Sequence, residues 1–311
     1  MKNDFKQPLF SVVIPAYNRA KVITRAIDSV IAQKFTDYEI VVIDDGSSDD
    51  LKSVCDKYNN EKIHYFYQEN AGACAARNAG IKKSQGIYIS FLDSDDTWEP
   101  EYLNEVAGKF SSDDDFGCVW VRSVQKHLPD EKITFMDGIA FEGNVYAKIL
   151  RQGYLTSTSF ITVKRSLLES LEGFDINLPA SQDDDISFRI AKSAKIGCIN
   201  KTLGTLYIDS SINRISSSAS RRAHGWFLLW RKFADDLLTF CGKKEFEKKF
   251  FNVYSMFYEI DDKEGLKTVE DFLIEKIGAS DYHYKFINFN NNKIIRFAKK
   301  IKKKAFLAFY D

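Results

Sequence analysis

Short apolar runs alternate with amphipathic segments over the first hundred residues of the chain. Four runs of five or six residues are apolar at nearly every position, which is typical of strands buried on both faces: 10–14, 38–43, 63–67 and 87–92. The segments between them predict helices over 22–31, 48–58 and 72–83, with Ser48 expected to cap the second. This alternation predicts an α/β fold in which a parallel sheet is covered by helices.

The pattern changes after residue 115. Strands are expected at 116–122, 159–163 and 203–208, and from about residue 220 the chain looks helical and rich in aromatic residues. We therefore expect a first domain over 1–215 and a C-terminal helical region over 216–311. The chain has 311 residues, of which 44% are apolar, and this is enough to bury cores of that size.

Composition narrows the class of protein. The five cysteines are scattered and form no CxxC pair, which argues against a zinc site or a disulfide framework. No leader is recognisable and no apolar run comes near the roughly 18 residues of a membrane span, so we expect a cytoplasmic protein.

Polar residues gather directly after three of the predicted strands. They are "PAYNR" at 15–19, "DDGSS" at 44–48 and "DSDD" at 93–96. In open α/β sheets, ligands bind beyond the carboxyl ends of the strands, where the strand order reverses. A strand order of 3-2-1-4 would place the aspartates at 93–96 opposite the loop at 15–19.

The three aspartates at 93–96 repel one another unless something compensates their charge. The chain lacks the GxGxxG and GxxxxGK[ST] loops that hold a diphosphate through backbone N–H groups. Paired carboxylates can instead hold Mg²⁺ or Mn²⁺, which also takes phosphate oxygens. The alternative is that Asp95 and Asp96 cap a helix near Pro100, and the spacing alone leaves both interpretations open.

Six segments together resemble the family 2 glycosyltransferases, which are inverting enzymes of the GT-A fold. The segments are "SVVIPAYNR", "EIVVIDDGSSD", "NAGACAARNAG", "YISFLDSDD", "GFD" and "QDDDISFRIAKSAKIGCI". The resemblance covers about 10–210. It implies a nucleotide-diphospho-sugar transferase fold, with a mainly parallel central sheet flanked by helices and a C-terminal helical extension.

The resemblance also implies which residues bind the nucleotide: Pro15, Ala16, Tyr17, Asn18, Arg19, Asp44, Gly72, Arg77 and Asp93. Tyr17 would offer a stacking face to the base, or would be a turn residue at the sheet edge. Asp44 would accept a hydrogen bond from the uracil imide, which favours a UDP-sugar, whereas Asp45 could be only a turn residue. Arg77 could contact a phosphate or pair with a carboxylate.

A divalent cation, Mn²⁺ or Mg²⁺, is implied at Asp95 and Asp93. It would neutralise charge on the phosphates of the departing UDP. Asp96 would be a cap or a supporting partner.

The resemblance makes Asp183 the base that removes the proton of the acceptor hydroxyl, although Gln182 stands where the family has glutamate. Helical spacing selects the same residue, because Asp183 shares a face with Ile186. Asp185 lies four residues before Arg189, which predicts an ordinary exposed ion pair. The alternative is that Asp183 is only an acid at a helix N-terminus.

A Ser- and Arg-rich segment over 210–225 follows the resembling part of the chain. Arg214, Arg221 or Arg222 could close over the donor diphosphate, or the segment could be a solvated linker. His224 in this segment matches no motif.

The C-terminal tail over 292–311 combines an apolar stripe at helical spacing with seven basic residues. A helix of this kind fits the surface of an anionic membrane, and we expect it at the inner face of the cytoplasmic membrane. The alternative is a solvated helix that docks on the protein itself. Binding of nucleic acid is not expected.

These observations predict an inverting, metal-dependent hexosyl- or N-acetylhexosaminyl-transferase. It would move a sugar from a UDP-sugar to a saccharide acceptor, expected to be lipid-linked and used in surface polysaccharide synthesis, and form a β-glycosidic bond. A nucleotidyltransferase and a non-catalytic nucleotide-sugar-binding protein are the alternatives.

Overall fold

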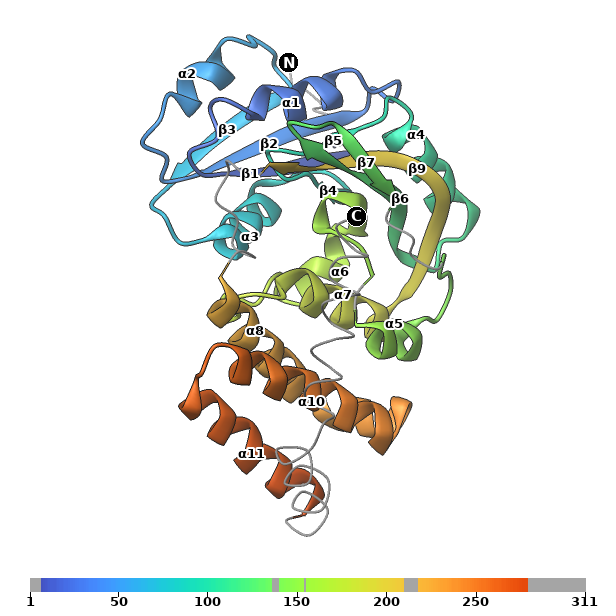
Figure 1. Cartoon of the computed structure of the whole chain (residues 1–311). Helices are drawn as coiled ribbons and strands as arrows, with labels where there is room; N and C mark the ends of the chain where they lie inside the picture. The colour runs from blue at the N-terminus through green and yellow to red at the C-terminus, as the bar shows by residue number, and fades with distance from the viewer. Residues whose placement is uncertain (1–6, 136–139, 154, 210–217, 279–311) are drawn as a thin grey trace. The chain divides into compact units, whose positions relative to one another are not determined.

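A computed structural model describes residues 7–135, 140–153, 155–209 and 218–278 of the chain (Figure 1). The chain forms two compact units, 1–243 and 244–311. The helix that starts at Ala219 belongs to the first of these units, whereas the sequence led us to expect a boundary at 215/216. The predicted basic tail lies outside the described residues. No described helix is both long enough and apolar enough to cross a bilayer.

Four parallel strands form one half of the sheet in the first unit, in the predicted order β3-β2-β1-β4. Their bounds are β1 Phe10–Ala16, β2 Tyr38–Asp45, β3 Ile63–Gln68 and β4 Tyr88–Phe91. Every residue of β1 and β2 is buried, which explains why these runs are continuously apolar rather than alternating. With this strand order, β1 and β4 flank the position where the order of the strands reverses, as considered from the sequence.

The sheet continues past β4 in the order β8-β6-β9-β5, and β7 pairs with β6. The bounds are β5 Thr97–Trp98, β6 Phe116–Leu128, β7 Lys132–Phe135, β8 Ile161–Lys164 and β9 Lys195–Asp209. A long parallel ladder joins β6 to β9, while β8 pairs antiparallel with both β4 and β6. The sheet is thus mixed, and Figure 1 shows β9 as a long, bent strand.

The strand predicted over 203–208 is only the second half of β9. The exposed polar residues 200–202 interrupt the apolar pattern, and the register against β6 shifts at the same place. From the sequence this break predicts the end of a strand. In the structure β9 continues through it, with an irregular register against β6.

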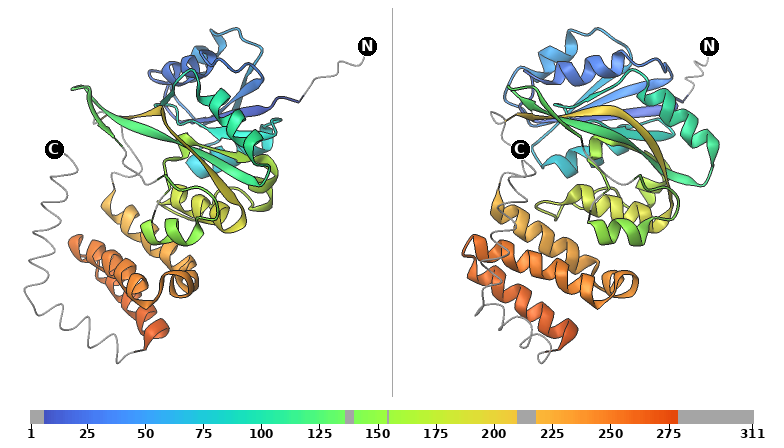
Figure 2. Two further views of the ribbon diagram at one scale, coloured as in Figure 1. Left: turned by 90° about the vertical axis from the view of Figure 1, so that its right-hand side faces the viewer. Right: turned by 45° about the vertical axis from the view of Figure 1, so that its right-hand side comes forward.

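Helices cover both faces of the sheet: Figures 1 and 2 show α1 and α2 over one face and α3 and α6 over the other. The bounds are α1 Ile23–Ile31, α2 Leu51–Asp56, α3 Ala73–Lys83, α4 Tyr102–Ser112, α5 Tyr146–Gln152 and α6 Arg165–Ser170. The later elements of the unit are the 3-10 turn η1 Thr158–Phe160, α7 Gln182–Ser193, α8 Ala219–Lys232, α9 Ala234–Asp236 and the π-helical turn η3 Leu237–Cys241.

The second unit contains α10 (Lys243–Glu259) and α11 (Lys263–Ile277) among its described residues. The rings of Phe250 and Phe272 contact each other across the two helices, with centroids 5.0 Å apart. An aromatic pair thus lies in the contact between α10 and α11, in keeping with the aromatic-rich sequence.

The helix predicted over 48–58 is shorter than expected, and Ser48 does not cap it. The residue before α2 is Asp50, and the backbone N–H of Ser48 donates to Asn18 Oδ1 at 2.8 Å instead. Ser48 therefore joins two loops at the sheet edge rather than starting a helix.

Gly80 allows α3 to lie directly on β1. A Cβ atom at this position would come within 2.2 Å of Cγ1 of Val13, which is itself fully buried. Because α3 also carries Arg77, this close approach sets how far that side chain stands from the strand ends.

We predict that Gly80→Ala lowers the free energy of unfolding by about 1–3 kcal/mol, because a buried strand must shift to admit one methyl group. Gly108→Ala in α4 is the matched control, since no atom lies within 4 Å of its added Cβ. That variant should be stabilised by about 0.5–1 kcal/mol. Thermal unfolding of both variants tests this, and equal midpoints would contradict the close contact.

Candidate active site

A cleft of about 1410 Å³ opens beyond the carboxyl ends of the parallel strands in the first unit. Most of the predicted site residues line it: Pro15, Ala16, Tyr17, Asn18, Arg19, Gly72, Arg77, Asp93, Asp95 and Asp183. The start of α7 and the start of α8 supply further lining residues, including Asp184, Arg221, Arg222 and Trp226. Asp44 is the one predicted site residue that does not line the cleft.

The loops after β1 and β2 are bound to each other. The backbone N–H of Asn18, a residue with φ of 53°, donates to Ser47 Oγ at 2.9 Å, and the N–H of Ala20 donates to Asp49 Oδ2 at 2.9 Å. The Tyr17 side chain remains 49% exposed at the cleft wall. The loop is therefore fixed through its backbone while the Tyr17 ring stays available to a ligand.

Asp44 and Asp45 are both buried, and of the two only Asp45 lines the cleft. Asp44 is buried, and it accepts hydrogen bonds from the Tyr65 hydroxyl and from the backbone N–H of Ser47. Burial and the hydrogen bond to Asp44 raise the pKa of Tyr65, so this hydroxyl stays a donor. Asp45 lines the cleft instead.

Asp45 also fixes the entry to α3. Its Oδ1 accepts from the Ala71 N–H at 2.9 Å and its Oδ2 accepts from the Gly72 N–H at 2.8 Å. Gly72 has φ of 92°, a conformation that side-chain-bearing residues rarely adopt. A glycine is thus required at position 72 for a local reason, because the chain must turn there to direct two N–H groups at the Asp45 carboxylate.

Arg77 forms an ion pair with Asp93, with Nη2 2.6 Å from Oδ1. Burial opposes the charge of the guanidinium, but the carboxylates of Asp93 and Asp183 outweigh it and raise the pKa of Arg77. Its Cζ also lies 5.4 Å from the centre of the Phe174 ring. Of the two alternatives for Arg77, the structure shows the carboxylate pair, at the cleft wall.

Asp96 stabilises the turn at 93–96 from inside. It is buried, and it accepts hydrogen bonds from Ser159 Oγ at 2.6 Å and from the Tyr207 N–H at 3.1 Å. Burial and the neighbouring carboxylates of Asp93 and Asp95 raise its pKa well above the ordinary value. The role of supporting partner predicted for Asp96 agrees with these contacts.

The alternative that Asp95 and Asp96 cap a helix is wrong. Helix α4 starts at Tyr102 after Glu101, while β5 directly follows Asp96. Asp95 faces the cleft, and its backbone carbonyl accepts a hydrogen bond of 2.6 Å from Arg25.

The carboxylates of Asp93 and Asp95 fit a divalent cation that is shared with a ligand. Among the described residues, no group of three His, Cys, Asp or Glu side chains converges on one metal position. Mg²⁺ and similar ions are commonly held by one or two carboxylates together with phosphate oxygens, without a complete protein cage. Asp93 Oδ1 is at the same time paired with Arg77.

Asp183 lies in the first turn of α7 and faces the cleft. The preceding Ser181 has φ of 64°, a left-handed conformation that costs about 1–3 kcal/mol for such a residue and must be held by its surroundings. The Thr158 N–H donates to Asp183 Oδ2 at 3.4 Å, and the Gln182 amide donates to the Leu178 carbonyl. Asp183 and Gln182 thus both line the cleft, and the Gln182 amide is held by the Leu178 carbonyl.

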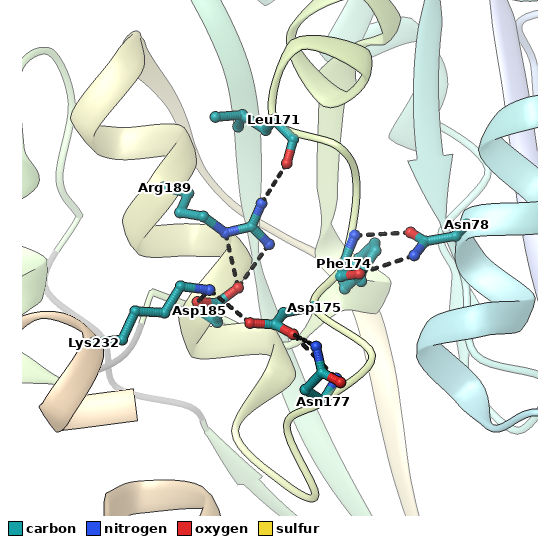
Figure 3. Close-up of polar contacts among 8 residues, drawn as sticks. All are labelled: Asn78, Leu171, Phe174, Asp175, Asn177, Asp185, Arg189 and Lys232. Atoms are coloured by element: carbon teal, nitrogen blue, oxygen red, sulfur yellow. Dashed lines mark hydrogen bonds and ion pairs between the residues drawn. The ribbon is translucent and has the colours of Figure 1, made fainter. Parts of the chain in front are cut away.

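Asp185 is fully buried, so the expectation of an exposed ion pair was wrong. The predicted pairing with Arg189 does exist, at 2.6 Å. The partner that makes burial possible is Lys232, whose Nζ lies 2.7 Å from Asp185 Oδ1 (Figure 3). This residue is far away in the sequence, and a helical-spacing argument could not reveal it.

Helix α8 brings cations and an aromatic ring to the cleft. Gly225 packs so closely on Ala180 that an added Cβ would come within 2.7 Å of Cβ of Ala180, and this contact sets α8 beside the start of α7. The Trp226 ring stacks on Trp230, with centroids 5.4 Å apart. Sequence reasoning missed Trp226, although a tryptophan within an aromatic-rich helix was a usable signal.

The remaining candidates of the 210–225 segment divide into two groups. Arg221 and Arg222 line the cleft, whereas Arg214 lies outside the described residues. His224 is exposed and absent from the cleft lining, and its Nδ1 lies 2.9 Å from the Ser220 carbonyl oxygen.

Comparison with known proteins agrees with this arrangement. The family described as "Glycosyl transferase family 2" matches residues 11–169, just over half of the chain. An uncharacterized glycosyltransferase of Rickettsia felis is 34% identical over 209 residues, which are 65% of this chain and 33% of that protein. The chain thus spans about a third of the length of this relative. The putative colanic acid biosynthesis glycosyl transferase WcaA of Escherichia coli K12 is 30% identical over 249 residues, 76% of this chain and 84% of that protein.

Solved structures share the fold at low sequence identity. The S. aureus TarS fragment 1–349 in complex with UDP-GlcNAc has a TM-score of 0.59 at 18% identity, covering 84% of this chain and 90% of that one. The mannosyltransferase PcManGT of Pyrobaculum calidifontis, in complex with GDP-Man and Mn²⁺, has a TM-score of 0.61 at 16% identity, covering 96% and 85%. These likenesses show the GT-A architecture that the sequence predicted. With the family match over residues 11–169, the chain belongs to glycosyl transferase family 2.

Proposed function

We propose that this glycosyltransferase moves a sugar from a UDP-sugar to an acceptor hydroxyl by single displacement, with inversion to a β-glycosidic bond. The observation that carries the proposal is the common cleft, in which Asp95 and Asp93 meet the loop after β1 and the base candidate Asp183. Such a reaction needs a site for the diphosphate, a face for the nucleotide and a base for the acceptor.

The nucleotide would bind between three segments: the loop after β1, the loop after β2 and the residues that lead into α3. Tyr17 exposes a ring on which a base can stack, and Asp45 presents a carboxylate to the same cleft. A carboxylate accepts a hydrogen bond from the imide N–H of uracil, which favours UDP. We assign this role to Asp45 rather than Asp44, because Asp45 lines the cleft and Asp44 does not.

The donor diphosphate would lie between Asp95 and the start of α8. A divalent cation held by Asp95 and Asp93 would neutralise phosphate charge when bound. Arg221 and Arg222 line the same cleft and can contact phosphate oxygens through their guanidinium groups.

Asp183 would accept the proton of the attacking hydroxyl. Its place in the first turn of α7 directs the carboxylate into the cleft, and the Thr158 N–H restrains one oxygen. Trp226 lies on the neighbouring helix, and its indole offers an apolar face of the kind on which sugar rings pack. We therefore assign the acceptor to the side of the cleft formed by α7 and α8.

The acceptor would be a saccharide used in surface polysaccharide synthesis. Two relatives support this class by name: WcaA, and the chondroitin synthase of Escherichia coli, which is 28% identical over 196 residues. A lipid-linked acceptor would fit the basic tail over 292–311, whose composition suits an anionic membrane.

Replacing Asp95 by alanine should abolish turnover, because the diphosphate loses its cation. Excess EDTA should have the same effect on the unaltered protein, and added Mn²⁺ or Mg²⁺ should reverse it. UDP release from a panel of UDP-sugars measures this, with Asp56→Ala as a control because Asp56 pairs with Lys52 outside the cleft. Full activity in EDTA would remove the metal from the proposal.

Asp183→Asn should lower kcat by about 10²–10⁴-fold while the affinity for UDP changes little, since the base acts on the acceptor alone. Asp184→Asn is the matched control, because Asp184 is the adjacent carboxylate in the same cleft. Steady-state kinetics and calorimetric titration with UDP separate the two quantities. A parallel fall of kcat and UDP affinity would make Asp183 a binding residue.

Deleting 292–311 should leave turnover with soluble acceptors largely unchanged and weaken binding to anionic liposomes. Each basic residue near such a surface contributes about 1 kcal/mol before screening by salt. Sedimentation with phosphatidylserine vesicles at low salt, compared with neutral vesicles, provides the measurement. Equal binding by both proteins would refute a membrane role for the tail.

A further inference from the structure

A charge cluster joins α7 and α8 to the turn that follows α6. Figure 3 shows its members: Asp175, Asp185, Arg189 and Lys232. The two carboxylates and two cations balance each other. Asp185 is fully buried, so its charge depends on these partners.

Lys232 is the member that connects separate elements. Its Nζ lies 2.7 Å from Asp185 Oδ1 and 2.8 Å from Asp175 Oδ2. Arg189 pairs with Asp185 within the same helix and donates to the Leu171 carbonyl at 2.8 Å, so it fixes α7 to the turn but not to α8. Within this cluster, the contact between α7 and α8 therefore depends on the Lys232 ammonium.

Asp175 connects the cluster, through the neighbouring Phe174, to residues on the side of the cleft assigned to the nucleotide. Burial opposes ionisation of Asp175, but the Lys232 ammonium and the Asn177 donors outweigh it and lower the pKa of this carboxyl. The adjacent Phe174 exchanges two hydrogen bonds with the Asn78 side chain, at 2.8 and 2.7 Å. Asn78 is the next residue after Arg77 on α3, whose guanidinium holds Asp93.

Asp185 connects the cluster to the proposed base, Asp183. Asp185 and Asp183 share the first turn of α7. Lys232 is the last residue of α8, and Gly225 forms a second contact of α8, on Ala180. Two contacts separated along a helix fix its axis, and the α8 residues that line the cleft take their positions from that axis.

We propose that Lys232 is a positioning residue, which holds α7 and α8 in the one arrangement that brings Asp183 and the cleft-lining residues of α8 to the same substrates. This inference rests on the proposed function, because it takes Asp183 to be the base. The ammonium acts through Asp185 and Asp175 and does not itself line the cleft.

Helix α7 provides a matched control at its other end. Lys192 forms an ion pair with Asp236, at 2.6 Å, and its side chain is 52% exposed, against 35% for Lys232. It lies away from the first turn of α7 and does not line the cleft. Loss of either lysine removes an ion pair, but only loss of Lys232 should move the base.

The test compares Lys232→Met, Lys232→Arg and Lys192→Met in the full chain. We expect Lys232→Met to lower kcat for UDP release by about 10- to 100-fold, because displacements near 1 Å have effects of that size. Lys232→Arg and Lys192→Met should stay within about threefold of the parent, since the charge or the first turn is preserved. A kcat of Lys232→Met near that of the parent, no rescue by arginine, or an equal loss in Lys192→Met would each overturn the proposal.

Amide hydrogen exchange supplies a readout that needs no donor or acceptor. Lys232→Met should speed exchange in peptides covering 181–186 and 219–232, and Lys192→Met should not; equal profiles would overturn the proposal. If Lys232→Met fails to fold, Asp175→Asn decides, with reduced kcat supporting the proposal and unchanged kcat opposing it. If the parent protein releases UDP from no donor, the proposed function fails, while the exchange data still test the link between α7 and α8.

Discussion

Mutual repulsion of carboxylates is the constraint on which the site depends. Six aspartates and four arginines line one cleft: Asp45, Asp93, Asp95, Asp96, Asp183 and Asp184, with Arg19, Arg77, Arg221 and Arg222. A buried carboxylate is stable only when donors or cations satisfy it. The buried Asp45 and Asp96 and the half-buried Asp93 each accept hydrogen bonds from another part of the chain. Arg77 of α3 donates to Asp93, Ser159 of η1 to Asp96, and the backbone at the entry of α3 to Asp45.

The same contacts assemble the cleft from elements distant in sequence. Ser159 donates to Asp96 and accepts from the Asp93 N–H at 3.1 Å, so one hydroxyl fixes both ends of the turn after β4. The Tyr207 N–H brings β9 to Asp96. The hydrogen bonds that satisfy the carboxylates are thus the same ones that hold the walls of the cleft together. The ends of the parallel strands determine only where the cleft lies.

Sequence alone could predict what local pattern determines. The apolar runs predicted the four parallel strands, and the polar residues after them predicted the edge where the cleft lies, given the order β3-β2-β1-β4 that the structure shows. The choice of Asp44 over Asp45 came from the resemblance, and the residue pattern could not check it, because neighbouring residues of a strand point to opposite sides and the motif does not say which side faces the ligand. The burial of Asp185 and the place of Trp226 depend on α8, whose contact with α7 is formed by Gly225 and Lys232. No periodicity within either helix records that contact.

Three consecutive aspartates at the start of α7 show how one helix turn can separate roles. Successive residues of a helix point about 100° apart, so a run of like side chains cannot share one environment. Asp183 and Asp184 face the cleft, whereas Asp185 is turned inward to Arg189 and Lys232. The inward carboxylate would be unstable without those cations, and the outward ones would be poorly placed without the inward anchor. The chemistry proposed for Asp183 and the stability of α7 therefore depend on the same few residues, which explains why an unusually acidic helix start is compatible with a folded protein.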